Sequence, residues 1–142
     1  MRLYLDASVL AAALLQEPGS DAVTEALESS GADLLVSDFA AAEVASALSR
    51  QVRMGVDTEV QAARRLEQFD EWRAITTTAV TLTAVDMEQA DRIVRRFDLQ
   101  LRTPDAVHVA MSGRLDARLV TLHLRLARAA AALGLPTAPP FD

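Results

Sequence analysis

Short apolar runs alternate along this chain with longer segments in which apolar residues recur every three or four positions. Three short runs, at residues 3–5, 34–36 and 118–121, consist mainly of Leu and Val. Runs of this length and composition are typical of strands that are buried on both faces. Residues 75–82 are rich in Thr and Val and predict a further strand.

The periodic segments predict helices, and several of them begin with a recognisable capping residue. Ser37, Thr83 and Thr103 each stand where a side-chain oxygen can accept a hydrogen bond from the first turn. Pro104, directly after Thr103, suits the first helical position. Residues 136–141 contain three prolines and predict an edge strand or a tail. The predicted helices cover residues 7–15, 21–29, 38–53, 57–72, 84–97, 104–112 and 124–133.

This alternation of strands and helices favours a parallel sheet with helices on both faces. We therefore predict an α/β protein with three layers, α/β/α, around a central, mainly parallel sheet of four to five strands. The length of 142 residues favours a single domain spanning residues 1–142. A hydrophobic content of 51% is enough to fill the core of such a domain.

Composition narrows the classes of function. The net charge of −6 argues against a nucleic-acid binder with a broad basic surface, so contact with nucleic acid would need a local offset of the acidic charge. All 14 basic residues are Arg, which fits either a composition bias or phosphate recognition by guanidinium groups. The chain has no cysteine, no apolar run long enough for a membrane span and no visible signal peptide, so we expect a cytoplasmic protein.

Asp6 is the first candidate for chemistry, because it directly follows the strand at residues 3–5. In an open parallel sheet, ligands bind at the carboxyl ends of the strands, so this carboxylate is expected to face a ligand. An Asp between a strand and a helix is also a common N-cap, and the sequence leaves that alternative open. Ser8 can hydrogen-bond a carboxylate in the site or simply cap the turn.

Two more carboxylates are predicted at the same edge of the sheet. Glu43 interrupts the apolar first half of the helix at residues 38–53, although a solvated Glu on its outer face would give the same pattern. Asp105 lies in the first turn of the helix at residues 104–112, where an acid also complements the helix dipole. Clustered carboxylates repel unless a cation intervenes, and oxygen ligands without cysteine suit Mg²⁺ or Mn²⁺. Together with Asp6, these residues predict a metal site that could orient water toward a phosphodiester.

Four segments, in the same order along the chain, resemble the motifs of the PIN-domain family. The third of them, Leu-Arg-Thr-Pro-Asp-Ala-Val-His-Val-Ala, is the most specific. In size, the chain looks most like the VapC toxins of bacterial toxin–antitoxin pairs. The segments are residues 3–8 with Asp6, residues 37–44 with Glu43, residues 101–110 with Asp105, and residues 119–123 followed by Leu126 and Ala127.

The resemblance implies a PIN-like fold and a metal-dependent endoribonuclease that hydrolyses RNA. It implies Asp6, Glu43 and Asp105 as catalytic and metal-binding residues, with Mg²⁺ as cofactor and Mn²⁺ as an alternative. It also implies a small VapB-type antitoxin as partner, together with a homodimer or a toxin–antitoxin hetero-oligomer.

His123 departs from the family pattern. The fourth motif usually contains Thr-x-Asp, and here His123 takes the place of the acid. We keep His123 as a tentative metal ligand, beside an RNA-contacting role or simple divergence. His108, inside the third segment, is expected to be a packed or partly exposed helix residue rather than a ligand.

The missing fourth acid leaves a second function open, namely a PIN-like RNA- or protein-binding module with weakened catalysis. A phosphoacceptor or phosphatase domain built on Asp6 is less well supported. Receivers need an acidic pair before the acceptor strand, and the phosphatase motif needs Asp where this chain has Ser8. An RNA-cleavage assay with Mg²⁺, Mn²⁺ and EDTA separates these three functions.

Overall fold

Five parallel strands form one sheet in this computed structural model, which describes residues 1–14 and 20–138. Their order across the sheet is β3–β2–β1–β4–β5, and every neighbouring pair is parallel. The predicted central sheet is therefore confirmed. The strands are β1 (Arg2–Leu5), β2 (Asp33–Ser37), β3 (Thr78–Val80), β4 (Arg118–Val120) and β5 (Thr137–Ala138).

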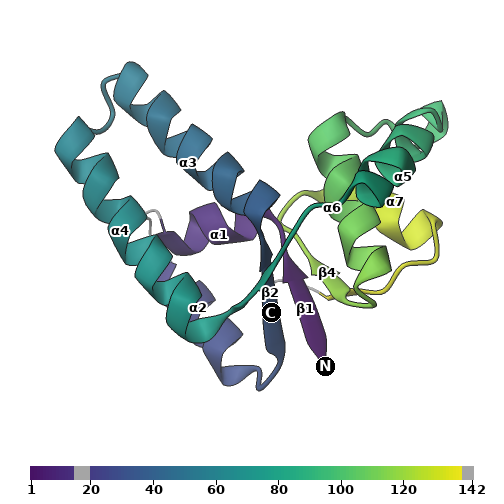
Figure 1. Cartoon of the computed structure of the whole chain (residues 1–142), viewed down its shortest axis with the longest axis horizontal. Coiled ribbons are helices and arrows are strands. Elements are labelled where there is room, and N and C mark those ends of the chain that lie inside the picture. The colour runs from purple at the N-terminus through teal and green to yellow at the C-terminus, as the bar shows by residue number, and fades with distance from the viewer. Residues whose placement is uncertain (15–19, 139–142) are drawn as a thin grey trace.

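Helices cover both faces of this sheet, as predicted. Figure 1 shows α1 to α4 on one side of the strands and α5 to α7 on the other. None of the helices within the described ranges combines the length and apolar character that a membrane span requires. The helices are α1 (Ala7–Leu14), α2 (Ser20–Ser29), α3 (Asp38–Arg53), α4 (Glu59–Thr76), α5 (Ala84–Val94), α6 (Thr103–Arg114) and α7 (Leu124–Ala132), with a short 3₁₀ helix η1 (Phe97–Leu99).

The strands separate two hydrophobic cores because successive side chains point to opposite faces. Leu3 and Leu5 pack into the core under α1 to α4, whereas Tyr4 between them packs into the core under α5 to α7. The same alternation divides Leu119 from Val120 in β4. Burial on both faces explains why these strands appear in the sequence as uninterrupted apolar runs.

The winding of the chain reverses at β1. From β1 the chain proceeds through β2 to β3 on one side, and then crosses to β4 and β5 on the other. In open α/β sheets, such a reversal creates a crevice at the carboxyl ends of the two central strands. Asp6 after β1 and Thr121 after β4 stand on the two sides of this crevice.

The predicted helix starts are confirmed at two of three caps. The Ser37 hydroxyl accepts the Ala40 N–H at 2.9 Å, and Thr83 forms a capping box with Asp86. The prediction for Thr103 is wrong, because α6 begins at Thr103 itself. The N-cap position before it belongs to a residue whose side chain makes no capping hydrogen bond, Arg102.

Two helices differ from prediction by more than two residues at one end. The helix predicted at 57–72 begins at Glu59, capped by Thr58, and continues to Thr76, which leaves only three residues for β3. The helix predicted at 84–97 ends at Val94, and Phe97, in η1, is 85% exposed rather than part of an apolar face. The predicted end of the first helix at residue 15 and the last three residues of the C-terminal segment predicted at 136–141 lie outside the described residues.

Candidate active site

Asp6 is a buried carboxylate, 3% exposed, at the carboxyl end of β1. Its Oδ1 accepts the Val9 N–H at 3.1 Å, so Asp6 is the N-cap of α1 that the sequence left as an alternative. Oδ1 also accepts the Ser8 hydroxyl at 2.6 Å, and Oδ2 accepts the Thr121 hydroxyl. Asp6 thus accepts three hydrogen bonds, which offset the cost of burying a polar group away from water.

The same two hydroxyls tie the turn after β4 to the turn after β1. Ser8 Oγ accepts the Leu122 N–H and Thr121 Oγ1 accepts the His123 N–H, both at 3.0 Å. Each hydroxyl therefore accepts from the backbone and donates to Asp6. This double use fixes the carboxylate across the crevice, and it shows that Ser8 hydrogen-bonds a carboxylate in the site, one of the two roles that the sequence left open.

Glu43 lies in α3 and faces α6 rather than the outer surface of its helix. Its Oε1 is 2.5 Å from His108 Nε2, and the His108 ring is almost completely buried. His108 Nδ1 lies 2.8 Å from the Tyr4 hydroxyl, which in turn lies 2.8 Å from Ser37 Oγ. A hydrogen-bonded chain therefore runs from Glu43 through His108 and Tyr4 to Ser37, the cap of α3.

One assignment of protons satisfies this whole chain. Ser37 Oγ already accepts the Ala40 N–H, so its own hydrogen is free to be donated to the Tyr4 oxygen. The Tyr4 hydroxyl then donates to His108 Nδ1, and His108 Nε2–H donates to Glu43. Burial raises the pKa of Tyr4 above its ordinary value, the Ser37 hydrogen bond lowers it, and the Glu43 charge raises it further, so the phenol stays protonated as a donor.

Asp105 is a half-buried carboxylate in the first turn of α6. Burial raises its pKa above the ordinary Asp value, the charges of His123 and His108 lower it, and the charges of Asp6 and Glu43 raise it. Asp105 thus lies within electrostatic reach of both Asp6 and Glu43. Asp6 follows β1, Glu43 lies in α3 just after β2, and Asp105 lies at the start of α6. The fold therefore brings together carboxylates that are far apart in the sequence.

The chemistry of these donors fits a hard divalent cation. Asp105 and one oxygen of Glu43 accept no hydrogen bond from residues 1–14 and 20–138, so they retain lone pairs for a ligand. Among residues 1–14 and 20–138, no three Asp, Glu or His side chains lie close enough together, in their present positions, to bind one metal ion. Binding of an ion would therefore have to draw these side chains closer.

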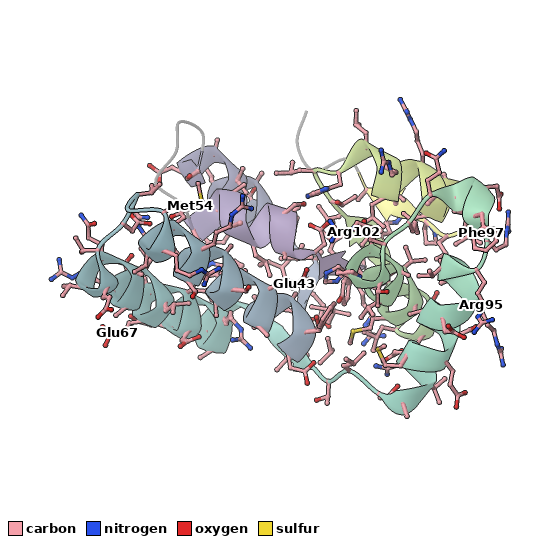
Figure 2. The ribbon with its side chains drawn as sticks, turned by 90° about the horizontal axis from the view of Figure 1, so that it is seen from above. Glu43, Met54, Glu67, Arg95, Phe97 and Arg102 are labelled. Carbon is pink, nitrogen blue, oxygen red and sulfur yellow. The ribbon has the colours of Figure 1, made fainter. Side chains whose placement is uncertain are left out.

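Two hollows meet at Glu43. The first hollow, of about 520 Å³, contains Asp105 and His123 and reaches the start of α7. The second hollow, of about 550 Å³, follows α3 away from the carboxylates to Met54. Figure 2 shows Glu43 between Met54 and Arg102 when the molecule is seen from above. The first hollow is lined by Glu43, Arg102, Pro104, Asp105, His123, Leu124, Arg125 and Leu126, and the second by Glu43, Ser46, Ala47, Arg50, Gln51, Arg53, Met54 and Val56.

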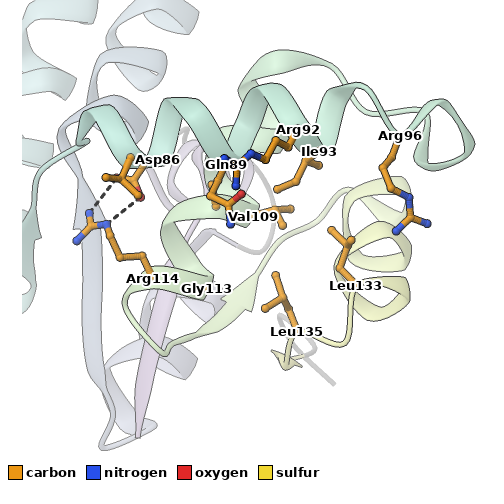
Figure 3. A pocket seen from close by; sticks show the side chains of 12 residues that line it. Asp86, Gln89, Arg92, Ile93, Arg96, Val109, Gly113, Arg114, Leu133 and Leu135 are labelled. Carbon is orange, nitrogen blue, oxygen red and sulfur yellow. Dashed lines mark hydrogen bonds and ion pairs between the residues drawn. The ribbon is translucent and has the colours of Figure 1, made fainter.

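A third hollow, of about 520 Å³, lies between α5, α6 and the end of α7, and it contains none of the three candidate carboxylates. Figure 3 shows the ion pair between Asp86 and Arg114 at one end of it and Arg96 at the other. Its walls combine arginines with apolar side chains such as Ile93 and Leu135. It is therefore separate from the candidate active site.

Comparison with known proteins assigns the family. The sequence matches the PIN domain family over residues 3–132. The chain belongs to the PIN domain family. Ribonuclease VapC3 from Pyrobaculum aerophilum is 30% identical over 136 residues, which cover 96% of this chain and 100% of that protein. Ribonuclease VapC26 from Mycobacterium tuberculosis is 31% identical over 120 residues, 83% of either chain.

A solved structure agrees with this PIN domain in fold. It is the crystal structure of VapBC2 from Rickettsia felis bound to a DNA fragment from their promoter. The two chains share 14% sequence identity with a TM-score of 0.71, over 97% of this chain and 98% of the other. The predicted PIN-like fold is confirmed by the family match and by this likeness.

The structure adds two residues to the site of this PIN domain that the sequence analysis did not place there. His108 was expected to be a packed helix residue; it is buried, and it also contacts Glu43. For Tyr4, the sequence predicts only a place within the strand at residues 3–5. A Tyr inside a doubly buried strand needs a hydrogen-bond partner for its hydroxyl, which was the available signal.

Proposed function

We propose that this PIN domain is a divalent-metal-dependent endoribonuclease toxin of the VapC type that hydrolyses RNA phosphodiester bonds. One observation carries the proposal: Asp6 and Glu43 lie close enough to Asp105 to raise its pKa, at the carboxyl ends of the central strands. The two relatives named as ribonucleases support RNA as the substrate. Because the proposed substrate is RNA, we propose that the protein acts in the cytoplasm.

Mg²⁺, or Mn²⁺ in its place, would be held by Asp6, Glu43 and Asp105, with His123 as a further ligand. When bound, such an ion polarises the phosphodiester and favours an attacking hydroxide. The residues of the chain prepare this site. Ser8 and Thr121 hold the Asp6 carboxylate in place by hydrogen bonds, and His108 binds Oε1 of Glu43 so that its other oxygen is left for the ligand.

The direct test is RNA cleavage by purified protein with Mg²⁺, with Mn²⁺ and with EDTA. We expect cleavage in either metal and none in EDTA. Asp6→Asn should lower the cleavage rate at least about 100-fold. Substitutions of residues that only support metal ligands often lower activity 10- to 100-fold, and this substitution changes a ligand itself. Asp91→Asn, which alters an exposed acid on α5, is the matched control and should cleave normally. Wild-type cleavage by Asp6→Asn would contradict the proposed site.

We propose a VapB-type antitoxin as the partner that neutralises the toxin, in a homodimeric or hetero-oligomeric complex. The likeness to VapBC2, a toxin–antitoxin pair by its name, supports this choice. Co-expression with a small neighbouring reading frame should relieve growth arrest. The mass of the purified protein, compared with 15.3 kDa for one chain, gives the oligomeric state.

His123 supports a second candidate function, a PIN-like RNA- or protein-binding module with weakened catalysis. It is exposed in the first hollow at the position where the resemblance leads us to expect an acid. This alternative predicts that the wild-type protein binds RNA but cleaves it in neither metal.

A further inference from the structure

Arginines line both hollows that meet at Glu43. Arg102 and Arg125 lie in the first hollow, and Arg50 and Arg53 in the second. We propose that these four side chains, the arginine track, bind the phosphates of single-stranded RNA on either side of the bond that is cut. The inference rests on the proposed function and extends it, because it names how the substrate reaches the same carboxylates.

The guanidinium groups of the track are available to an anion. Six of the 14 arginines pair with Asp side chains within residues 1–14 and 20–138, and none of the six belongs to the track. Within the track, Arg53 donates to the Ser49 hydroxyl at 2.7 Å, a neutral partner. All four track arginines are exposed. The paired arginines are Arg2, Arg65, Arg73, Arg95, Arg96 and Arg114.

Helix electrostatics do not explain the whole track. Arg50 and Arg53 lie in the last turn of α3, where a cation is favourable. Arg102, in contrast, occupies the N-cap position of α6, and Arg125 lies in the first turn of α7. Cations at helix N-termini are disfavoured by the helix dipole. Their placement beside Asp105 therefore points to a negatively charged ligand in the first hollow.

The geometry places cations on both sides of the carboxylates. Arg50 follows Glu43 by two helical turns on one face of α3, roughly 10 Å along the axis. Arg102 and Arg125 lie beyond Glu43 on the other side, as Figure 2 shows for Arg102. A chain of phosphates crossing Glu43 would meet guanidinium groups before and after it.

This arrangement also answers the problem posed by the net charge of −6. A divalent ion can neutralise the phosphate that reacts, but the flanking phosphates would still be repelled by the acidic protein. Guanidinium groups bind phosphate through paired, charge-assisted hydrogen bonds. The track supplies the local offset that an acidic nuclease needs in order to hold RNA.

The test measures RNA binding apart from cleavage. Fluorescence anisotropy of a labelled single-stranded RNA of about 12 nucleotides is recorded in Mg²⁺ over a range of salt, with Asp6→Asn as the uncleaving background. Two double variants, Arg50→Gln with Arg53→Gln and Arg102→Gln with Arg125→Gln, each remove one half of the track. The matched control is the double variant Arg92→Gln with Arg118→Gln. Both arginines are exposed and form no ion pair in the described residues. Arg92 lines the third hollow, and Arg118 begins β4, at the end of that strand away from Thr121.

We expect each half-track variant to lose about tenfold or more in affinity at low salt, and the control to lose less than about twofold. The slope of log affinity against log salt should fall by about 1.4 for each half-track variant, since one phosphate contact with a single strand contributes about 0.7. Circular dichroism checks that the exposed substitutions leave the fold intact.

Equal affinity and slope in the half-track and control variants would overturn the track. An absence of RNA binding by the Asp6→Asn background would overturn it as well. Normal RNA binding combined with loss of antitoxin binding would assign these arginines to the protein partner and reject the RNA proposal. A different measurement tests the proposed function. If the control variant, Arg92→Gln with Arg118→Gln, cleaves no RNA when it carries the wild-type Asp6, the proposed function is wrong.

Discussion

At the scale of single residues, the contact with His108 orients the Glu43 carboxylate. Its ring is buried, and its two nitrogens contact Glu43 on one side and the Tyr4 hydroxyl on the other. Glu43 comes from α3 and His108 from α6, so this contact joins two helices that cover opposite faces of the sheet. The carboxylate is thus oriented by a side chain that belongs to the other layer.

We predict that His108→Phe lowers the RNA cleavage rate about 10- to 100-fold, the usual cost of losing a group that orients a metal-binding carboxylate. His108→Gln should lie between this variant and the wild type, because its amide can still donate to Glu43. The measurement determines kcat and KM for RNA cleavage separately. We expect kcat to fall and KM to change little. Equal activity of the Phe variant and the wild type would show that Glu43 needs no support.

Tyr4→Phe is the control for a purely structural effect. It removes the partner of His108 Nδ1 and of Ser37 while leaving the His108–Glu43 contact in place. A buried polar group without a partner costs on the order of 1–3 kcal/mol. We therefore expect a loss of stability larger than the loss of activity, the reverse of the His108 variants.

We predict that His123→Asp tightens Mg²⁺ binding and raises cleavage in Mg²⁺ more than in Mn²⁺. His123 lines the first hollow with Asp105, and a carboxylate there would add a hard oxygen ligand, whereas Mn²⁺ accepts imidazole more readily. Calorimetric Mg²⁺ titration and cleavage rates test this. Loss of activity in both metals would show that the imidazole itself takes part in the site.

At the scale of elements, an ion pair between Arg114 and the buried Asp86 ties α6 to α5. Asp86, 1% exposed, accepts Arg114 Nε at 2.8 Å and a second guanidinium nitrogen at 3.0 Å. Burial by itself raises the pKa of Asp86, but hydrogen bonds from Arg114 and from Thr83 lower it below the ordinary value. Arg114 also donates to the Thr81 carbonyl, so one side chain fastens α6 to the start of α5.

We predict that Asp86→Asn lowers the free energy of unfolding by on the order of 2 kcal/mol at neutral pH. Because the folded-state pKa is depressed, the stability from the charged form is present above the ordinary Asp pKa of about 3.9 and is lost as pH falls through the folded value. The difference between variant and wild type should therefore shrink in acid. Urea unfolding over a pH series measures it.

Asp91→Asn is the control on the same helix, since Asp91 pairs with Arg95 at the surface. Exposed pairs contribute little, so this variant should unfold like the wild type at every pH. An Asp86→Asn deficit that stays constant into strong acid would contradict the assigned pKa direction.

At the scale of the whole molecule, the charged carboxylate of Asp105 weakens the fold. Burial and the charges of Asp6 and Glu43 raise the pKa of Asp105, so folding stability falls as the pH rises from the ordinary Asp pKa through the folded-state pKa, and the full cost is present above the folded-state pKa. Asp105 has no hydrogen-bond donor among the described residues to offset this cost. A bound divalent ion would remove it.

We predict that Asp105→Asn melts at a higher temperature than the wild type in EDTA at neutral pH. Added Mg²⁺ should raise the melting temperature of the wild type more than that of the variant, because an ion that binds only the folded state stabilises it. Glu67→Gln, an exposed change on α4, should respond to Mg²⁺ like the wild type. An identical Mg²⁺ response in Asp105→Asn would exclude Asp105 as a ligand.

The sequence by itself determined the elements and their order. Apolar runs of strand length, periodic segments and capping residues such as Ser37 and Thr83 act over a few neighbouring positions, so they are visible without the fold. Alternation of strands and helices then predicts a parallel sheet, and the place of Asp6 at the end of β1 follows from that. Where local signals are weak, as at Thr103 and Phe97, the predicted boundaries were wrong.

Only the tertiary structure decided which side chains meet. His108 lies 65 positions from Glu43 and 104 from Tyr4, and Arg114 lies 28 positions from Asp86. These contacts depend on how α3, α5 and α6 pack on the sheet, which no local pattern of apolar and polar residues specifies. For the same reason, the sequence shows fourteen arginines and an acidic net charge, whereas the folded chain separates those paired with Asp from those that line the hollows beside Glu43.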